Sequence, residues 1–228
     1  MAPRQAKART PVRQPRVLLT GFEPFDGEHA NPSQQIVEQL DGRTIAGHRI
    51  VGAVLPVTFA QTQPLLQQLL ERHRPRLAIA LGQAGGRAEL SLERVAINLV
   101  DARIADNGGA QPVDQPVIAG APPAYFSSLP VKAILAALRD RAIPAALSLS
   151  AGSYVCNQVF YLLAHLLATA HPDTRGGFIH VPWLPAQVVA RPGQPSMALA
   201  TMTDGVATAI ACALATEQDL HVPGGSTH

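Results

Sequence analysis

Apolar runs that suit β-strands alternate along the chain with longer runs that suit amphipathic helices. The strand-like runs cover residues 17–20, 49–57, 76–82, 93–100, 145–150 and 177–183. Apolar residues recur at helical spacing in residues 34–40, 58–75, 129–143, 156–170 and 196–216. The run at 76–82 (RLAIALG) is of the continuous kind that is buried on both faces of a sheet. The alternation predicts an α/β fold with a largely parallel sheet.

Several connecting segments should gather at one edge of this sheet, beyond the carboxyl ends of its strands. They are residues 21–33, 82–92, 150–156 and 180–185. Ligands of open α/β folds bind at that edge, so we expect the functional site there. Residues 101–125 form a long segment rich in Gly, Pro and Asp, which predicts a functional or mobile loop. Ser33 is the expected N-cap of the first helix.

Residues 16–220 contain no linker or internal repeat, and we expect them to form one domain. Residues 1–16 carry five basic side chains and no acidic one, which leaves 13 basic and 16 acidic residues in the remainder. We therefore expect a disordered basic arm over residues 1–15, and a disordered tail over residues 221–228. The acidic balance of the body argues against nucleic-acid binding. No run reaches the ~18 apolar residues of a membrane span.

Cys156 lies where a strand, a turn of small residues and a helix meet, in the stretch SAGSYVCNQVFYLLAHLLATA. At a helix N-terminus the macrodipole favours a thiolate. A free cysteine is also one of the commonest core residues. Position alone leaves both a catalytic and a packing role open. With only two cysteines in the chain, a disulfide framework is excluded and a reducing compartment is favoured.

A catalytic cysteine needs a base, and His180, at the end of an apolar run, is the histidine best placed to serve. An acid should orient the imidazole. Spacing does not choose among the acidic candidates, which are Glu93, Asp101, Asp106 and Asp114.

Metal and nucleotide chemistry find little support in the sequence. It has no HExxH, no CxxC and no tight His/carboxylate cluster, so no metal site is expected. The glycines of residues 82–89 fit neither a dinucleotide fingerprint nor a phosphate loop. A cysteine hydrolase that uses no cofactor is the leading hypothesis from the residues themselves.

Long blocks of a recognisable pattern run in order through most of residues 17–190. They read VLLTGFEPFDGEHANPS, then GQAGGRAELSLERVAINLVDARIADNGGAQPV, then SAGSYVCNQVFY, and finally GGFIHVPWLP. Together they closely resemble the pyroglutamyl peptidase I family, also called pyrrolidone-carboxylate peptidases. The resemblance implies a single-domain three-layer α/β/α sandwich around a twisted, largely parallel mixed sheet. It also implies a cysteine exopeptidase that releases an N-terminal pyroglutamate from peptides through a thioester.

The same resemblance assigns roles to individual residues. The family's nucleophile falls on Cys156, its histidine on His180 and its glutamate on Glu93. The arginine near the oxyanion falls on Arg103. The expected substrate contacts are two aromatic residues flanking the lactam ring and two polar side chains, namely Phe22, Phe25, Gln83 and Asn31. Leu92 stands where the family usually has proline, which could alter how the glutamate is presented.

The family resemblance further implies a cytoplasmic homo-oligomer, often a tetramer, whose partners are pyroglutamyl peptides rather than nucleic acids or membranes. Two other functions stay open. The chain could be a thiol amidase for a different N-blocked substrate, or a catalytically silent small-molecule binding protein on the same fold.

Overall fold

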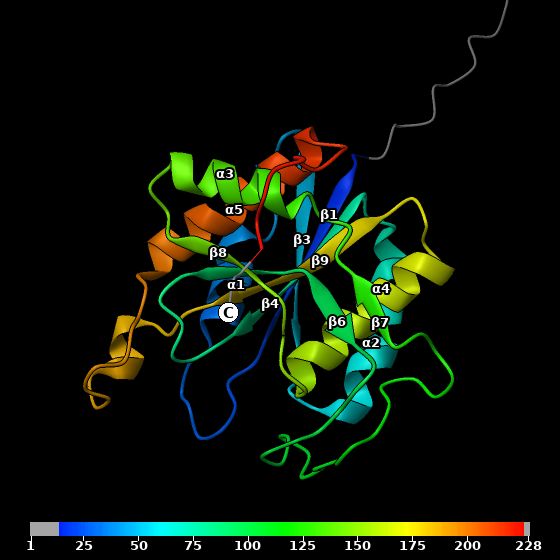
Figure 1. Cartoon of the computed structure of the whole chain (residues 1–228), viewed down its shortest axis with the longest axis vertical. Helices are drawn as coiled ribbons and strands as arrows, with labels where there is room; N and C mark the ends of the chain where they lie inside the picture. The colour runs from blue at the N-terminus through cyan, green and yellow to red at the C-terminus, as the bar shows by residue number, and fades with distance from the viewer. Residues whose placement is uncertain (1–13, 226–228) are drawn as a thin grey trace, which may run out of the picture.

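A seven-stranded mixed sheet forms the centre of the protein, whose computed structural model describes residues 14–225 (Figure 1). Its strand order is β2-β3-β1-β4-β9-β5-β8. The bounds are β1 (Arg16–Phe22), β2 (Thr44–Ile45), β3 (His48–Leu55), β4 (Leu77–Gln83), β5 (Leu90–Glu93), β8 (Ala145–Ser148) and β9 (Arg175–Val181). Pairing is parallel except for β2 with β3 and β5 with β9. The predicted largely parallel mixed sheet is confirmed.

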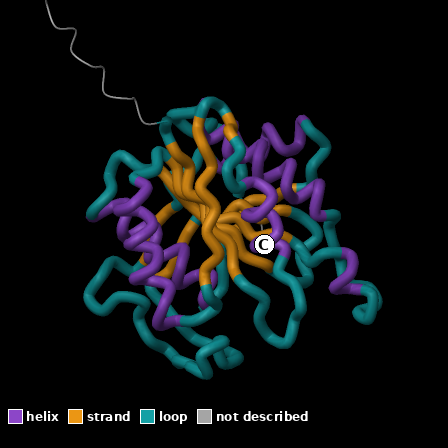
Figure 2. Tube along the Cα trace, turned by 180° about the vertical axis from the view of Figure 1, so that it is seen from behind, coloured by secondary structure: helices purple, strands orange, loops and turns teal. Residues whose placement is uncertain are grey.

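Helices cover both faces of the sheet, which gives the expected three layers (Figure 2). One face carries α1 (Pro32–Leu40), α3 (Val131–Asp140) and α5 (Leu199–Ala215), and the other carries α2 (Phe59–His73) and α4 (Val155–Thr169). Each face has its own cluster of buried apolar side chains. The single-domain α/β/α architecture is therefore confirmed.

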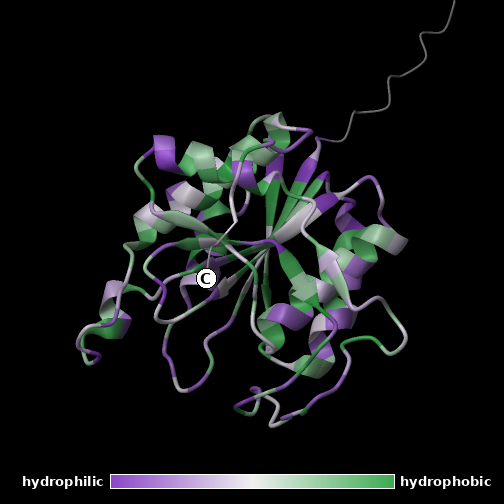
Figure 3. Cartoon of the chain, viewed as in Figure 1, coloured by the Kyte–Doolittle hydropathy of each residue, from purple (hydrophilic) through white to green (hydrophobic). Residues whose placement is uncertain are grey.

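The central strands are apolar on both faces because both faces are covered. All residues of β1 except the first, and all of β4 except the last, are buried. Figure 3 shows this core as green strands, with purple concentrated on the outer helices and loops. Burial of a continuous apolar strand on both sides favours this fold by roughly 25 cal/mol for each Å² of apolar surface removed from water.

Residues 93–100 do not form the single strand that their apolar character predicts. The chain turns at Arg94, so that β5 ends at Glu93 in the main sheet and β6 (Val95–Ile97) pairs with β7 (Ala124–Phe126) in a separate two-stranded sheet. A run of apolar residues cannot reveal such a division, because both pieces contain buried residues: β5 is buried throughout and β6 in part.

The first helix is capped by Asn31 rather than by Ser33. The Asn31 side chain accepts a hydrogen bond from the Ser33 backbone N–H at 3.0 Å, and Pro32 occupies the first helical position. Asparagine is as good an N-cap as serine, and proline is favoured directly after the cap. The expectation for Ser33 was therefore wrong by two residues.

The long segment 101–125 is tied to the rest of the domain by hydrogen bonds. The Asp106 carboxylate accepts from the backbone N–H groups of Phe59, Gly108 and Ala110 at 2.7–2.9 Å. The Tyr154 hydroxyl donates to the carbonyl of Ala105 at 3.0 Å. The segment is thus fixed against α2 and against the start of α4.

Most of the expected basic arm, residues 1–13, and the last part of the expected tail, residues 226–228, lie outside the described residues. The Pro15 carbonyl accepts a hydrogen bond from Arg49 at 2.9 Å. Among residues 14–225, no helix is long and apolar enough to cross a membrane.

Candidate active site

The Cys156 sulfur and the His180 side chain both lie next to Gly82, a strand residue without a side chain. Gly82, next to last in β4, is the register partner of His180 in the parallel strand β9. A methyl group placed on Gly82 would lie 2.8 Å from Cys156 Sγ. Because register partners point to the same face of a sheet, the Cys156 sulfur and the His180 ring lie on the same face, above two adjacent strands.

Glu93 approaches His180 from the next strand. In the antiparallel pair of β9 and β5, Ser91 lies opposite His180, and Glu93 lies opposite Phe178. Glu93 Oε1 is 2.8 Å from His180 Nδ1, and both side chains are buried. An ionised carboxylate can only accept, so Nδ1 carries the proton of this bond and Nε2 keeps its lone pair.

The carboxylate of this pair is ionised and the imidazole is neutral. Burial acts to raise the pKa of Glu93, but the interaction with His180, with smaller effects of Ser148 and Arg87, outweighs it, so the pKa is lowered. Burial, together with the positive charge of Arg87, lowers the pKa of His180 by more than Glu93 raises it. His180 is therefore suited to accept a proton at neutral pH.

Cys156 is a neutral thiol at rest. It is the second residue of α4, near the positive end of the helix dipole. Burial, followed by the negative charge of Glu93, nevertheless raises the pKa of the thiol to about 12. To act as a nucleophile, this sulfur would first have to lose its proton to a base.

The start of α4 offers backbone donors beside the sulfur. Its N-cap, Tyr154, makes no side-chain capping bond. The first N–H groups of a helix have no partner within the helix, so the Cys156 N–H can bind an oxyanion. Asn157 anchors this turn by accepting from Ile97 N–H at 3.0 Å and donating to the carbonyls of Ile97 and Leu99, both at 2.9 Å.

A narrow apolar cavity adjoins the sulfur. Its volume is about 10 Å³, roughly the room for one water molecule. The lining residues are Phe22, Phe25, Asn31, Val57, Gln83, Tyr154, Val155 and Cys156. Phe22 is buried, whereas Phe25 and Tyr154 are only half-buried. These two half-buried rings would have to move apart to admit a five-membered ring.

Gln83 is held by a partner that sequence reasoning missed. Its Oε1 accepts from Gln187 Nε2 at 2.9 Å. The same Gln187 amide lies within bonding distance of Glu28 Oε2 and of the carbonyl of Ala30. With its oxygen engaged, Gln83 presents its NH₂ group as the available donor.

Asn31, another expected substrate contact, is largely occupied by the loop that contains it. Its Oδ1 accepts from the Ser33 backbone N–H and hydroxyl, and its Nδ2 donates to the Glu23 carbonyl at 3.0 Å. The residue lines the cavity and is buried. These bonds hold the loop that contains Phe25.

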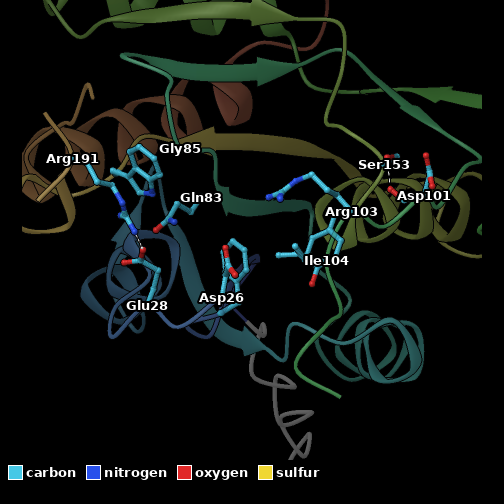
Figure 4. A pocket seen from close by; sticks show the side chains of 12 residues that line it. Asp26, Glu28, Gln83, Gly85, Asp101, Arg103, Ile104, Ser153 and Arg191 are labelled. Atoms are coloured by element: carbon cyan, nitrogen blue, oxygen red, sulfur yellow. Dashed lines mark hydrogen bonds and ion pairs between the residues drawn. The ribbon is translucent and has the colours of Figure 1, made fainter. Parts of the chain in front are cut away.

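A larger cavity of about 380 Å³ shares Phe25, Gln83 and Tyr154 with the apolar one. Figure 4 shows Arg103 reaching into it toward Gln83. Within residues 14–225 the Arg103 guanidinium makes no hydrogen bond or ion pair, and the residue is exposed. Arg103 is not among the residues that line the apolar cavity at Cys156.

The other acidic candidates lie away from the imidazole. Asp106 is engaged by the backbone bonds described above, Asp101 lines the larger cavity, and Asp114 is exposed with a φ of 48°. Only Glu93 forms a hydrogen bond with the His180 ring in the part of the chain that the structure describes. In the same part, no group of three His, Cys, Asp or Glu side chains could hold a metal ion.

A thiol, an imidazole and a buried carboxylate on adjacent elements of an α/β sheet define the class of cysteine hydrolases. The family model described as pyroglutamyl peptidase matches residues 15–216. The chain belongs to the pyroglutamyl peptidase family.

Relatives over nearly the whole chain agree with this assignment. The pyrrolidone-carboxylate peptidase of Klebsiella pneumoniae is 56% identical over 212 residues, which is 93% of this chain and 99% of the relative. Pyrrolidone-carboxylate peptidase 1 of Ralstonia nicotianae is 52% identical over 214 residues, 94% of this chain and 100% of the relative.

Solved structures of the same family superpose closely. The crystal structure of pyroglutamyl peptidase I from Bacillus amyloliquefaciens gives a TM-score of 0.88 at 42% identity, over 91% of this chain and 100% of that one. A mutant pyrrolidone carboxyl peptidase from Pyrococcus furiosus gives 0.86 at 45% identity, over 88% and 98%.

Proposed function

We propose that this protein is a cysteine exopeptidase that hydrolyses the bond after an N-terminal pyroglutamate. Membership of the pyroglutamyl peptidase family supports the substrate. The observation that carries the chemistry is the buried pair of His180 and Glu93, 2.8 Å apart, on the face of the sheet that holds the Cys156 sulfur.

In the first step His180 Nε2 takes the thiol proton as Cys156 Sγ attacks the carbonyl carbon that joins pyroglutamate to the next residue. The sulfur–carbon bond forms and the carbonyl oxygen becomes an oxyanion. The buried carboxylate of Glu93 stabilises the imidazolium that results. The thiol needs this proton transfer, because it is neutral at rest.

The oxyanion is held by the free N–H of Cys156 at the start of α4. One such donor is typically worth about 3–4 kcal/mol in the transition state. We assign a second, electrostatic contribution to Arg103, whose unpaired guanidinium points into the adjoining cavity. Collapse of the intermediate breaks the carbon–nitrogen bond, and His180 gives its proton to the leaving amine.

Water then completes the cycle. His180 removes a proton from the water as it attacks the thioester carbon, and the carbon–sulfur bond breaks. The proton returns to the sulfur through His180, and pyroglutamate leaves with its new carboxylate. The proposed cycle uses water as its only co-reactant and needs no cofactor.

The apolar cavity suits a neutral lactam better than a charged amino terminus. Phe22 and Phe25 would contact the ring faces, and the Gln83 NH₂ would donate to the lactam carbonyl. A desolvated lactam group without a partner would weaken binding by about 1–3 kcal/mol. We assign Asn31 to the shape of the loop around the ring, with its remaining N–H free to contact substrate.

The wider setting is also proposed on the family resemblance. We propose that the protein acts in the cytoplasm on pyroglutamyl peptides, as a homo-oligomer and specifically a tetramer. Light scattering coupled to size exclusion measures the assembly, and a monomer at micromolar concentration would contradict it.

Hydrolysis of pyroglutamyl-aminomethylcoumarin under reducing conditions tests the proposed activity. Wild type and Cys212→Ser should turn over, because Cys212 lies half-buried on α5 away from the site. Cys156→Ser should lose activity to background. A folded wild type without activity would contradict the peptidase function.

Two further measurements, cleavage of other N-blocked substrates and binding of pyroglutamate, separate the proposed function from its two competitors. Prolyl and acetyl-alanyl coumarin amides should not be cleaved; preference for either would indicate a thiol amidase with another N-blocked substrate. Binding of pyroglutamate without any turnover would indicate a catalytically silent binding protein.

A further inference from the structure

Arg87 joins two parts of the site that lie far apart in sequence, the end of β5 and the segment 148–150. It lies between β4 and β5, and its Nη1 is 2.7 Å from Glu93 Oε1. The same Nη1 approaches Ser148 Oγ at 3.5 Å, and Nη2 donates to the Ser150 carbonyl at 3.1 Å. Ser150 begins the turn that leads into α4 and Cys156. Arg87 therefore connects the buried carboxylate to the turn before the nucleophile.

The Glu93 carboxylate depends on very few partners for its orientation. Its Oε1 is shared by His180 and Arg87. Its Oε2 is buried and has no hydrogen-bond partner within residues 14–225. The Glu93 side chain is fully buried, whereas that of Arg87 is 33% exposed. Loss of Arg87 would leave His180 as the one ionisable group that holds this carboxylate.

Titratable or charged groups face His180 from three directions. Glu93 faces it from β5, Cys156 from the start of α4, and Arg87 from the loop before β5. The adjacent strand β4 contributes Gly82, which has no side chain. Without Arg87, the negative charge of Glu93 would act on the imidazole without an opposing positive charge. The site is buried and of low dielectric constant, where such interactions are strong, so the protonated imidazole would be favoured.

We propose that Arg87 is a positioning residue for the reaction, which fixes the Glu93 carboxylate and offsets its charge so that His180 remains a neutral base for Cys156. This inference rests on the proposed function. The direction of the pKa shifts agrees with the geometry, since Arg87 acts to lower the pKa of Glu93, of His180 and of Cys156. Arg87 is a part of the site that sequence reasoning missed: neither the comparison of residues 82–89 with nucleotide motifs nor the family resemblance assigned it a role.

The test is the pH dependence of kcat/KM for pyroglutamyl-aminomethylcoumarin in Arg87→Met, with Arg94→Met as control. Arg94→Met also removes one positive charge next to β5, but the Arg94 side chain lines a separate cavity with Phe126, Glu217 and Asp219. In Arg87→Met, both limbs of the profile should move to higher pH by roughly half to one unit, because a positive charge near the imidazole and the thiol is lost. At the new optimum kcat should fall about 10-fold while KM stays within about twofold.

Arg87→Lys distinguishes charge from shape. It keeps the positive charge, but an ammonium group lacks the planar fork of nitrogens with which the Arg87 guanidinium donates to Glu93 and to the Ser150 carbonyl at the same time. Its limbs should stay within roughly 0.3 pH units of wild type while kcat falls. A profile of Arg87→Met with unmoved limbs, or an equal shift in Arg87→Lys or Arg94→Met, would overturn the proposal.

A second readout does not depend on the substrate. In a Cys212→Ser background, the rate at which iodoacetamide alkylates Cys156 at one fixed, mildly alkaline pH should fall in Arg87→Met, because less of the thiol is ionised, and should stay unchanged in Arg94→Met. No change in Arg87→Met would overturn the proposal even if turnover is lost. If wild type shows no turnover but alkylation changes in Arg87→Met as expected, the result would contradict the proposed substrate and not the role of Arg87.

Discussion

Replacement of Gly82 by alanine should disable the site through a single methyl group. The added carbon would lie 2.8 Å from Cys156 Sγ, 2.8 Å from Phe178 Cζ and 3.1 Å from Phe178 Cε1. Favourable contacts of this kind lie at about 3.5–4.0 Å. Sulfur and ring must therefore each retreat by close to 1 Å. Gly82 has no positive φ, so crowding rather than backbone strain causes the effect.

The magnitude follows from the two contacts. Overpacking of a tight core costs about 1–3 kcal/mol, which for a domain of this size lowers the Tm by roughly 2–12 °C. A misplacement of about 1 Å at the reacting atom can cost about 100-fold in rate. We therefore expect kcat/KM of Gly82→Ala to fall about 100-fold at a temperature where the protein is fully folded.

Gly205→Ala is the matched control. Its methyl group would lie 2.4 Å from Leu90 Cδ1, in the apolar cluster on the opposite face of the sheet. It should therefore perturb packing while kcat/KM stays within about twofold of wild type. Circular dichroism gives the Tm of each variant, and coumarin release gives the rate. A Gly82→Ala enzyme within about threefold of wild type would refute the reasoning that Gly82 sets the position of the sulfur.

Three further predictions concern the supports of the site. Gln187→Met should raise KM for the pyroglutamyl substrate about 5- to 10-fold with little change in kcat, because Gln83 loses the bond that orients its amide; an unchanged KM would contradict this. Asp106→Asn should lower the Tm by roughly 2–6 °C, since a neutral amide accepts the three backbone bonds less well; an unchanged Tm would show that the segment 101–125 is held by other contacts. The free energy of unfolding should fall as pH rises above about 9, because the Cys156 thiol ionises there in the unfolded chain, whereas in the folded protein its pKa is raised to about 12. Thermal scans should therefore show a steeper decline of Tm with pH for wild type than for Cys156→Ala. Equal declines in the two proteins would contradict the raised pKa.

The layered fold was predictable because its cause is local and repetitive. Apolar runs such as residues 76–82 are buried on both faces, and helical spacing marks the runs that cover them. The family resemblance then supplied the three-layer arrangement. The division of residues 93–100 between two sheets was not predictable, because it depends on the long-range pairing of Val95–Ile97 with Ala124–Phe126.

The site was predictable only in part, for a different reason. Spacing could not choose among four acids, and the choice of Glu93 came from resemblance; in the structure its carboxylate is the one that meets His180. The protonation state of Cys156 depends on burial as well as on the helix dipole, and only the dipole can be inferred from sequence. No sequence pattern indicated a role for Arg87 or Gln187, because the side chains that they contact lie on other elements.

The reversed direction of β5 explains how a carboxylate can lie deep beneath the imidazole. His180 is next to last in β9, at the edge where the sheet's loops gather. A parallel neighbour would place its own late residues level with His180, at the exposed edge. Because β5 runs antiparallel, its chain enters at that edge through the loop that carries Arg87 and reaches Glu93 only at its fourth residue, opposite Phe178. The same reversal thus buries the acid and leaves the arginine above it, within reach of both the acid and solvent.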